Sequence, residues 1–365
     1  MAELPPKQTF WFGKDLVQNE NEWIINLNDV QLSEICDAVK RVVEKGNNLL
    51  QEFPESSVET LITTKILPFI TATDFPLPTL AILLKNVKKE LLNGKGFVVI
   101  KRLPVEVYSP LERAIAFMGI GSYIGNSRSQ NAKGHLLGHV YDLGLSSSNP
   151  NVRLYTTKER LTFHTDSCDV VGLLCLSEAK QGGDSLLVSA GAIYNRMHDE
   201  RPDLLARLLS PMPHDRRGEV PAGQKPWFNI PVFSWYENYL SVFYQRQYFD
   251  SSQRFEEAPR LTAEDIEALN MFDDLTNHPE FQLKMRLEAG AIQFVHNHVL
   301  LHDRTAFENW PEMEKRRHLL RLWLSCTDAR PLPEHFEARY GSVEIGNRGG
   351  IIVPGSFLKV PIFPE

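Results

Sequence analysis

The sequence lacks the features that define several classes of protein. Its 365 residues include only four cysteines, and because none of them forms a C-x-x-C pair, a disulfide framework and a structural zinc site are not expected. It has no run of about 18 apolar residues and no apolar signal-peptide core near its start, so we expect a cytoplasmic protein without a membrane partner. It also has no internal repeat and no low-complexity tract.

Basic patches are lacking as well. The net charge is −7, and no dense cluster of lysine and arginine is interleaved with aromatic residues, which argues against a nucleic-acid partner. The content of 42% hydrophobic and 23% charged residues is that of an ordinary globular protein. The expected partner is therefore a small molecule, and the composition leaves open whether the chain forms a homo-oligomer.

Helical patterns dominate the first 95 residues. Apolar side chains recur at three- and four-residue spacing from about residue 29 and predict a helix that ends near Gly46. The same spacing predicts a second helix over 79–92, which stops at Asn93-Gly94. We expect this N-terminal region, residues 1–95, to pack on the outside of the core that follows it.

From residue 96 the pattern changes to short apolar runs separated by turns, which indicates strands. The expected elements are strands at 96–100, 170–176, 185–188, 281–287, 291–297 and 316–324, strands between 227 and 248 with a hairpin turn at Glu237-Asn238, and helices at 110–119, 190–198, 201–209 and 262–275. This order predicts a mainly β fold with helical decorations, a double-stranded β-helix (jelly roll) over 96–365 that forms one structural unit with the N-terminal region. Two of its segments, 119–151 and 340–355, are expected to act as lids.

His164 and Asp166 stand two residues apart, just before the strand predicted at 170–176. In an extended chain, residues i and i+2 face the same side, so both side chains can reach one metal ion. A second histidine would complete the two-histidine, one-carboxylate set of non-haem Fe(II) oxygenases, which leaves three coordination positions open. Three histidines further along the chain could supply it: His296, His298 and His302.

The segment 316–324 carries two arginines in an apolar setting. If it is extended, Arg317 and Arg321 share one face with Leu319 and Trp323. Guanidinium groups on an apolar face are costly unless they meet anions. We therefore expect this face to bind anionic groups.

Four motifs follow one another along the chain: Phe163-His164-Thr165-Asp166, Gly182-Gly183-Asp184-Ser185, the stretch from Asn297 to Phe307, and Arg316-Arg317 with Arg321. Together they resemble the taurine-dioxygenase-like family of Fe(II)/2-oxoglutarate oxygenases, within the clavaminate-synthase-like superfamily. Each motif alone is common, but the four in this order and spacing are specific. The resemblance runs from about residue 96 to 324, and more loosely to 350.

The resemblance implies roles for individual residues. His164, Asp166 and His302 would be the iron ligands. Arg317 would pair with the remote carboxylate of 2-oxoglutarate, a contact to which a bidentate guanidinium is suited. Ser185 stands where the family often has a threonine that binds the same carboxylate, so it is a second candidate for cosubstrate binding.

Other positions leave alternatives open. Arg321 matches a position that binds an acidic group of the substrate in some relatives and the cosubstrate in others. Asn131, in the long segment 119–151, is a further candidate for substrate contact, with a solvated role as the alternative. Where the family commonly has Asn-Arg, this chain has Asn297-His298, which leaves His298 and His296 as competing ligands. No catalytic residue is expected beyond the metal site.

The activity that the resemblance implies is that of an Fe(II)/2-oxoglutarate-dependent dioxygenase, which consumes O2 and releases succinate and CO2. A small acidic or zwitterionic substrate, such as an amino acid, would suit an acidic protein with a buried Arg321. Hydroxylation is the default outcome, with desaturation or ring closure left open. The alternatives are a zinc-type metal hydrolase, which would need a general base, and a catalytically inactive jelly-roll binding protein.

Overall fold

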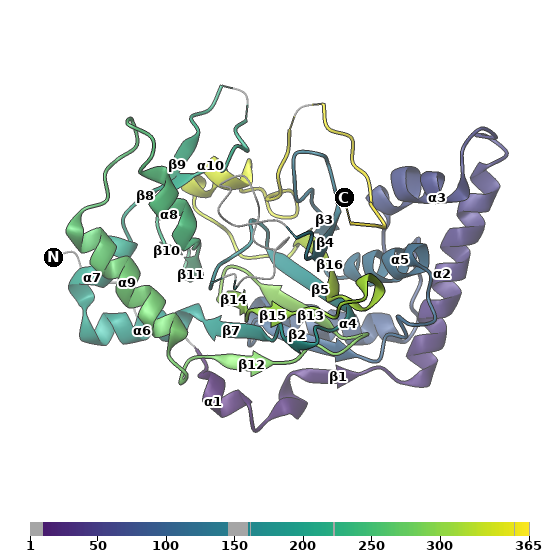
Figure 1. Ribbon diagram of the computed structural model, residues 1–365, viewed down its shortest axis with the longest axis horizontal. Helices are drawn as coiled ribbons and strands as arrows, with labels where there is room; N and C mark the ends of the chain where they lie inside the picture. Colours follow the sequence, from purple (N-terminus) through teal and green to yellow (C-terminus); the bar gives the residue numbers. More distant parts are fainter. Residues whose placement is uncertain (1–9, 145–159, 161, 222, 354, 365) are drawn as a thin grey trace.

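The computed structural model describes residues 10–144, 160, 162–221, 223–353 and 355–364. Strands occupy the centre of the molecule, and helices flank them on opposite sides (Figure 1). None of the helices in these ranges combines the length and the hydropathy needed to cross a membrane.

The elements follow the chain in a mixed order. The helices are α1 (Gly13–Leu16), α2 (Asp29–Leu49), α3 (Val58–Leu61), α4 (Leu80–Asn93), α5 (Pro110–Gly121), α6 (Ala190–Glu200), α7 (Pro202–Leu208), α8 (Arg246–Ser252), α9 (Ala263–Asn277) and α10 (Glu337–Tyr340), with the short helical turns η1 (Glu20–Glu22), η2 (Ile62–Ile66), η3 (Leu67–Phe69), η5 (Met313–Lys315) and η6 (Glu334–Phe336). The strands are β1 (Ile24–Asn26), β2 (Phe97–Lys101), β3 (Asn126–Ser127), β4 (Leu137–Tyr141), β5 (Val170–Ser177), β6 (Gln181–Gly182), β7 (Ser185–Ser189), β8 (Met212–Asp215), β9 (Trp227–Ile230), β10 (Phe233–Tyr236), β11 (Tyr239–Val242), β12 (Leu283–Met285), β13 (Ile292–His296), β14 (Leu300–Arg304), β15 (Phe307–Glu308) and β16 (His318–Ser325).

The largest sheet has seven strands in the order β1-β2-β13-β5-β16-β3, with β4 also paired to β16. Strand β1 runs parallel to β2, whereas β13 and β16 both run antiparallel to β5. Because side chains alternate along a strand, Val98 and Ile100 of β2 pack with residues of α2, α4 and α5 on one face, and Phe97 and Val99 point to the other. We call the helix-covered side of this sheet the outer face and the opposite side the inner face.

A second sheet, of order β12-β7-β14, covers the inner face. Leu187 of β7 and Leu300 of β14 share a buried cluster with Val171 and Val295 of the large sheet. The alternate side chains of β7 and β14 point away, into a cluster with residues of α6, α7 and α9. The two sheets therefore face each other, with α2 on one flank and α6, α7 and α9 on the other (Figure 1).

Local sequence signals explain where several elements begin and turn. Ser109 and Thr262 are N-caps of α5 and α9, and each forms a capping box with the residue three positions on, an arrangement that stabilises a helix by roughly 0.5–2 kcal/mol. Glu237 and Asn238 have φ values of 45° and 64°, and they join β10 to β11 in a tight hairpin as predicted. The helix predicted over 79–92 is α4.

The predicted end of the first helix is wrong. Gly46 does not end it, because α2 continues to Leu49 and uses Gly46 to approach Ile62: a Cβ on Gly46 would lie 2.6 Å from the Ile62 side chain. The segment 119–151 contains regular structure, since its first residues belong to α5 and β3 and β4 follow. Its part from residue 145 onward lies outside the described residues.

The strand pattern near the predicted metal ligands also differs. His164 and Asp166 are not in a regular strand but in the segment that precedes β5, and His302 lies within β14, a strand that was not predicted. Helices are as prominent as strands in the described ranges, so the fold is a mixed sheet-and-helix arrangement rather than a mainly β one. Neither of the two facing sheets closes into a barrel over these ranges.

Candidate metal centre

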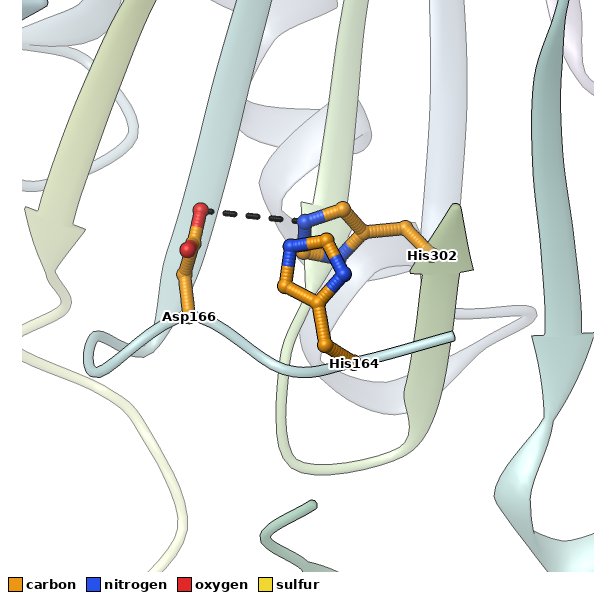
Figure 2. Close-up of side chains that lie close together, drawn as sticks. All are labelled: His164, Asp166 and His302. Atoms are coloured by element: carbon orange, nitrogen blue, oxygen red, sulfur yellow. Dashed lines mark ion pairs between the residues drawn. The ribbon is translucent and has the colours of Figure 1, made fainter. Parts of the chain in front are cut away.

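Two distant chain segments carry the three predicted iron ligands into one buried place. His164 and Asp166 lie before β5, and His302 lies on β14. The backbones of His164 and His302 bond to each other in both directions, with each N–H donating to the other's carbonyl oxygen at 3.0 Å. Figure 2 shows the three side chains gathered around one small space. Backbone pairing between the two segments, rather than the spacing of His164 and Asp166 alone, creates this arrangement.

The three side chains have the distances expected of a metal-binding set. One ligand atom from each lies within 4.8 Å of the others. His302 Nε2 is 3.7 Å from Asp166 Oδ2, and the two imidazole rings are 4.2 Å apart at their centroids. His164 Nδ1 lies 2.9 Å from the carbonyl oxygen of Thr162, to which it donates when its proton is on Nδ1. This bond orients the ring and leaves the Nε2 lone pair for a metal.

The electrostatics give Asp166 and His302 the protonation states that metal ligands need. Burial by itself would raise the pKa of Asp166, but the charge of Arg321 and the nearby His302 outweigh it and hold this pKa at about 2. Burial lowers the pKa of His302 to about 3. At neutral pH the site therefore offers a carboxylate and a neutral imidazole, which are the forms that bind Fe(II) or Zn(II). The residues present fit a divalent transition metal.

Trp323 and Arg321 of β16 fix the carboxylate of Asp166, and Asn297, just after β13, holds its backbone. Trp323 Nε1 donates to Asp166 Oδ2 at 2.9 Å, and Arg321 Nη1 lies 3.4 Å from the same oxygen. The backbone N–H of Asp166 donates to Asn297 Oδ1 at 3.0 Å. Such neighbours of a ligand set its orientation and tune its affinity for the metal.

The competing histidines have other surroundings. His298 Nε2 is 3.0 Å from Asp169 Oδ1, with both side chains fully buried, and His296 is buried at the end of β13. Neither belongs to the group of ligand atoms around Asp166. The structure brings His302, and neither of the other two, together with His164 and Asp166.

A second buried network, centred on Asp169, was not expected from the sequence. Its carboxylate accepts hydrogen bonds from Arg348 Nε at 2.8 Å, from His298 and from the backbone N–H of Cys326 at 2.9 Å. Close by, Arg339 Nε donates to Ser167 Oγ at 2.8 Å. The residues 339–351 thus bond to the turn that carries Asp166. No local pattern could have predicted this, because the partners lie more than 170 positions apart in the chain.

Arg317 immediately precedes β16 and lies against Gly183, just after β6, and Phe307 of β15. Its Nη2 donates to the carbonyl oxygen of Gly183 at 3.2 Å, and its guanidinium lies 5.2 Å from the centre of the Phe307 ring. Its Nη1 is buried and has no hydrogen-bond partner among the described residues. Burial lowers its pKa to about 10, so the group stays charged at neutral pH. A buried, charged donor without a partner is suited to an anionic ligand.

Gly183 is the reason that Arg317 fits there. A Cβ on Gly183 would lie 2.7 Å from Arg317 Nε, and its φ of +76° is one that side-chain-bearing residues rarely adopt. Ser185, two residues on, donates from Oγ to Gln293 Oε1 at 3.0 Å. Gln293 is a buried polar neighbour that sequence reasoning missed, since a lone glutamine in a strand carries no signal.

The predicted substrate residues have defined contacts of their own. Arg321 Nε donates to Gln130 Oε1 at 2.8 Å, so this guanidinium lies between Gln130 and Asp166. Asn131 Oδ1 accepts from the backbone N–H of Lys133 at 2.9 Å and thereby closes a local turn. The structure brings Arg321 to the candidate ligands, but no described contact joins Asn131 to them.

Comparisons with known proteins identify a sequence family and relatives. The sequence model of the family described as taurine catabolism dioxygenase TauD, TfdA family matches residues 62–323. The FR-33289 synthase of Streptomyces rubellomurinus is 28% identical to this chain over 321 residues, which cover 87% of this chain and 89% of the synthase.

Solved structures share the fold. An asparagine oxygenase in complex with Fe(II), 2S,3S-3-hydroxyasparagine and succinate superposes with a TM-score of 0.60 at 14% identity, covering 83% of this chain and 93% of that one. The non-heme iron oxygenase OrfP, in complex with Fe and alpha-ketoglutaric acid, superposes with a TM-score of 0.55 at 14% identity, covering 82% of this chain and 93% of that one. At this identity the likeness is one of fold.

Proposed function

The chain belongs to the taurine catabolism dioxygenase TauD, TfdA family, and from this premise we propose that it is an Fe(II)- and 2-oxoglutarate-dependent dioxygenase that oxidises a C–H bond of a small carboxylate- or amino-acid-like substrate. The observation that carries the proposal is the presence of two buried features. One is the buried set of His164, Asp166 and His302, and the other is the buried Arg317 with an unpartnered N–H. The first suits Fe(II), and the second suits the cosubstrate.

His164, Asp166 and His302 would hold the iron. When bound, Fe(II) together with 2-oxoglutarate and O2 supplies the oxidising power to break an unactivated C–H bond, and succinate and CO2 are released. The protein's own contribution is to keep Asp166 ionised and oriented through Trp323 and Arg321. Burial of all three ligands excludes water, which protects the chemistry from side reactions.

Arg317 would bind the remote carboxylate of 2-oxoglutarate. Its Nη1 offers a charge-assisted hydrogen bond that no described residue uses. Ser185 is a lesser candidate for the same carboxylate, because its hydroxyl proton already goes to Gln293 and a cosubstrate would have to share or replace that bond. A guanidinium in this position selects for a dicarboxylic cosubstrate over a monocarboxylic one.

Two observations bear on the substrate class. An asparagine oxygenase with bound hydroxyasparagine shares this fold, and an amino acid or similar acid would suit a pocket that holds a second guanidinium, Arg321. That arginine lies against Asp166 and Gln130, so its predicted role as a substrate anchor competes with a role in orienting Asp166. The role of Asn131 in substrate binding, the oligomeric state and a cytoplasmic location stay predictions.

Anaerobic titration of the Fe(II)-loaded protein with 2-oxoglutarate tests the proposal. We expect the weak visible charge-transfer band of the iron chelate, its loss in His302→Ala, and a much higher 2-oxoglutarate requirement in Arg317→Ala. The matched controls are His278→Ala and Arg41→Ala, at exposed residues of the same types. Zinc in the purified protein with no band after iron loading would favour the metal hydrolase, and a folded protein that binds no metal would favour the inactive binding protein.

Arg321→Gln separates its two candidate roles. If Arg321 binds substrate, succinate formation without substrate should proceed as in the wild type, and only the response to substrate should weaken. If it orients Asp166, the Fe(II) affinity should fall as well. Succinate formation without substrate and the Fe(II) affinity can both be measured before the natural substrate is known.

A further inference from the structure

A cavity of about 410 Å³ lies on the outer face of the large sheet, away from the metal centre. Leu137 of β4 and Leu320 of β16 form its floor, and both belong to the outer cluster. The C-terminal residues Ile362 and Phe363 and the start of α5 form its walls. A volume of this size is in the range of sites that bind drug-sized molecules.

Two arginines line the cavity without an ionic partner. Neither Arg113 nor Arg316 forms an ion pair with a described residue. Arg113 donates from Nε to the carbonyl oxygen of Val105 at 2.7 Å, so its terminal N–H groups remain available to a ligand. Arg316 Nε is buried and has no hydrogen-bond partner among the described residues. Such a donor is costly in an apolar wall unless a ligand meets it.

The other polar groups of the lining leave the positive charge in excess. Glu314 is the one carboxylate among its described residues. His318 bonds to His139 at 2.8 Å between ring nitrogens, and burial lowers its pKa to about 3, so it is neutral at neutral pH. The lining therefore includes two arginines and one exposed carboxylate in a mainly apolar surface.

We propose that this outer cavity, lined by Leu137, Leu320, Ile362, Arg113 and Arg316, binds an amphiphilic anion, a molecule with one carboxylate or sulfonate group on an apolar body. The site is separate from the proposed cosubstrate site, because Arg317 reaches the opposite face, where it contacts Gly183 and Phe307. Its ligand would be an effector rather than a substrate, since the sheet separates it from the three metal ligands.

Titration with the fluorescent dye anilinonaphthalene sulfonate tests the proposal, because the dye is itself an apolar anion and binding needs neither metal nor 2-oxoglutarate. We expect saturable binding to the wild type that weakens about tenfold in Arg316→Gln and in Arg113→Gln, the loss expected for one charge-assisted hydrogen bond. The matched control is Arg41→Gln, at an exposed arginine of α2. Decanoate should displace the dye, whereas decanol, with the same chain and no charge, should not.

Two further variants keep the result decisive. Leu176→Trp places an indole in the cavity without changing its charge and should abolish dye binding, even if an arginine variant folds poorly. Arg317→Ala should leave dye binding unchanged. Equal affinity in the wild type and both glutamine variants, displacement by decanol as strong as by decanoate, or loss of binding in Arg317→Ala would each overturn the proposal. The last result would place the dye on the inner face, and none of the three depends on the proposed dioxygenase activity.

Discussion

Two aspartates three residues apart, Asp166 and Asp169, each meet a histidine and an arginine, yet their surroundings differ in one respect. Asp169 is saturated: Arg348, His298 and the N–H of Cys326 all donate to it, and its side chain is fully buried. Asp166 has Trp323 and a longer contact to Arg321, and its histidine neighbours turn ring nitrogens toward the same space. The comparison teaches that a candidate metal site is recognised by donor atoms left over after structural bonds are made, not by residue types.

The largest expected effect separates His302 from His298. His302→Ala should lower iron-dependent turnover by at least ~10³-fold, equivalent to about 4 kcal/mol in the activation barrier, and leave the free energy of unfolding nearly unchanged. His298→Ala should leave iron-dependent turnover nearly unchanged. It should lower the free energy of unfolding by roughly 2 kcal/mol, because it removes a buried hydrogen bond to a charged group. Succinate formation and urea unfolding of both variants check this. If His298→Ala lost iron binding and His302→Ala kept it, the metal ligand would be His298 and not His302.

Arg348→Ala should cost the most stability. Removing one partner of a fully buried ion pair leaves Asp169 with an uncompensated charge, and such changes cost about 3–5 kcal/mol. Urea unfolding of the metal-free protein measures this, with Arg41→Ala as the control at an exposed arginine. Arg348→Lys should recover part of the loss. An unfolding free energy within 1 kcal/mol of the wild type, roughly the size of one ordinary hydrogen bond, would contradict a structural role for the pair.

The Asp169 network also predicts a pH dependence. Burial lowers the pKa of His298 to about 4 from its ordinary 6.5. Between pH 6.5 and 4 the unfolded chain therefore binds a proton that the folded protein does not, so stability falls as the pH falls through this window. This histidine contributes on the order of 2–3 kcal/mol to the fall. In His298→Gln the fall measured by urea unfolding should be smaller, whereas His278→Gln, at an exposed histidine, is the matched control.

The smallest effect concerns the fine position of Asp166. Trp323→Phe removes the N–H that donates to Asp166 Oδ2 and keeps most of the ring in the inner cluster. We expect Fe(II) affinity to fall about 10–100-fold, the usual effect of losing a neighbour that orients a metal ligand. Trp227→Phe, on β9, is the control. An unchanged affinity would mean that Arg321 alone is enough to orient the carboxylate.

Local sequence signals were enough for most single elements. Some features depend only on residues within three positions of one another and can therefore be predicted directly from the sequence. These are the capping boxes at Ser109 and Thr262 and the hairpin at Glu237-Asn238. The alternation in 316–324 correctly placed Arg321 and Trp323 on one buried face. The end of α2 was missed because Gly46 meets Ile62, a contact that helix periodicity does not encode.

The sequence by itself determined which residues could act: His164, Asp166 and one of three later histidines, and arginines in an apolar segment. The tertiary structure decided which of them come together. It paired the segment of His164 with β14, so that His302 joins Asp166. It directed His298 to Asp169, which also accepts a hydrogen bond from Arg348, 179 positions further along the chain. The physical reason is that the alternation of side chains along a strand predicts which face of the sheet a residue is on, but not which residues pack against that face. Long-range pairing of strands and turns supplies that neighbour, and with it the charge and the burial that decide the chemistry.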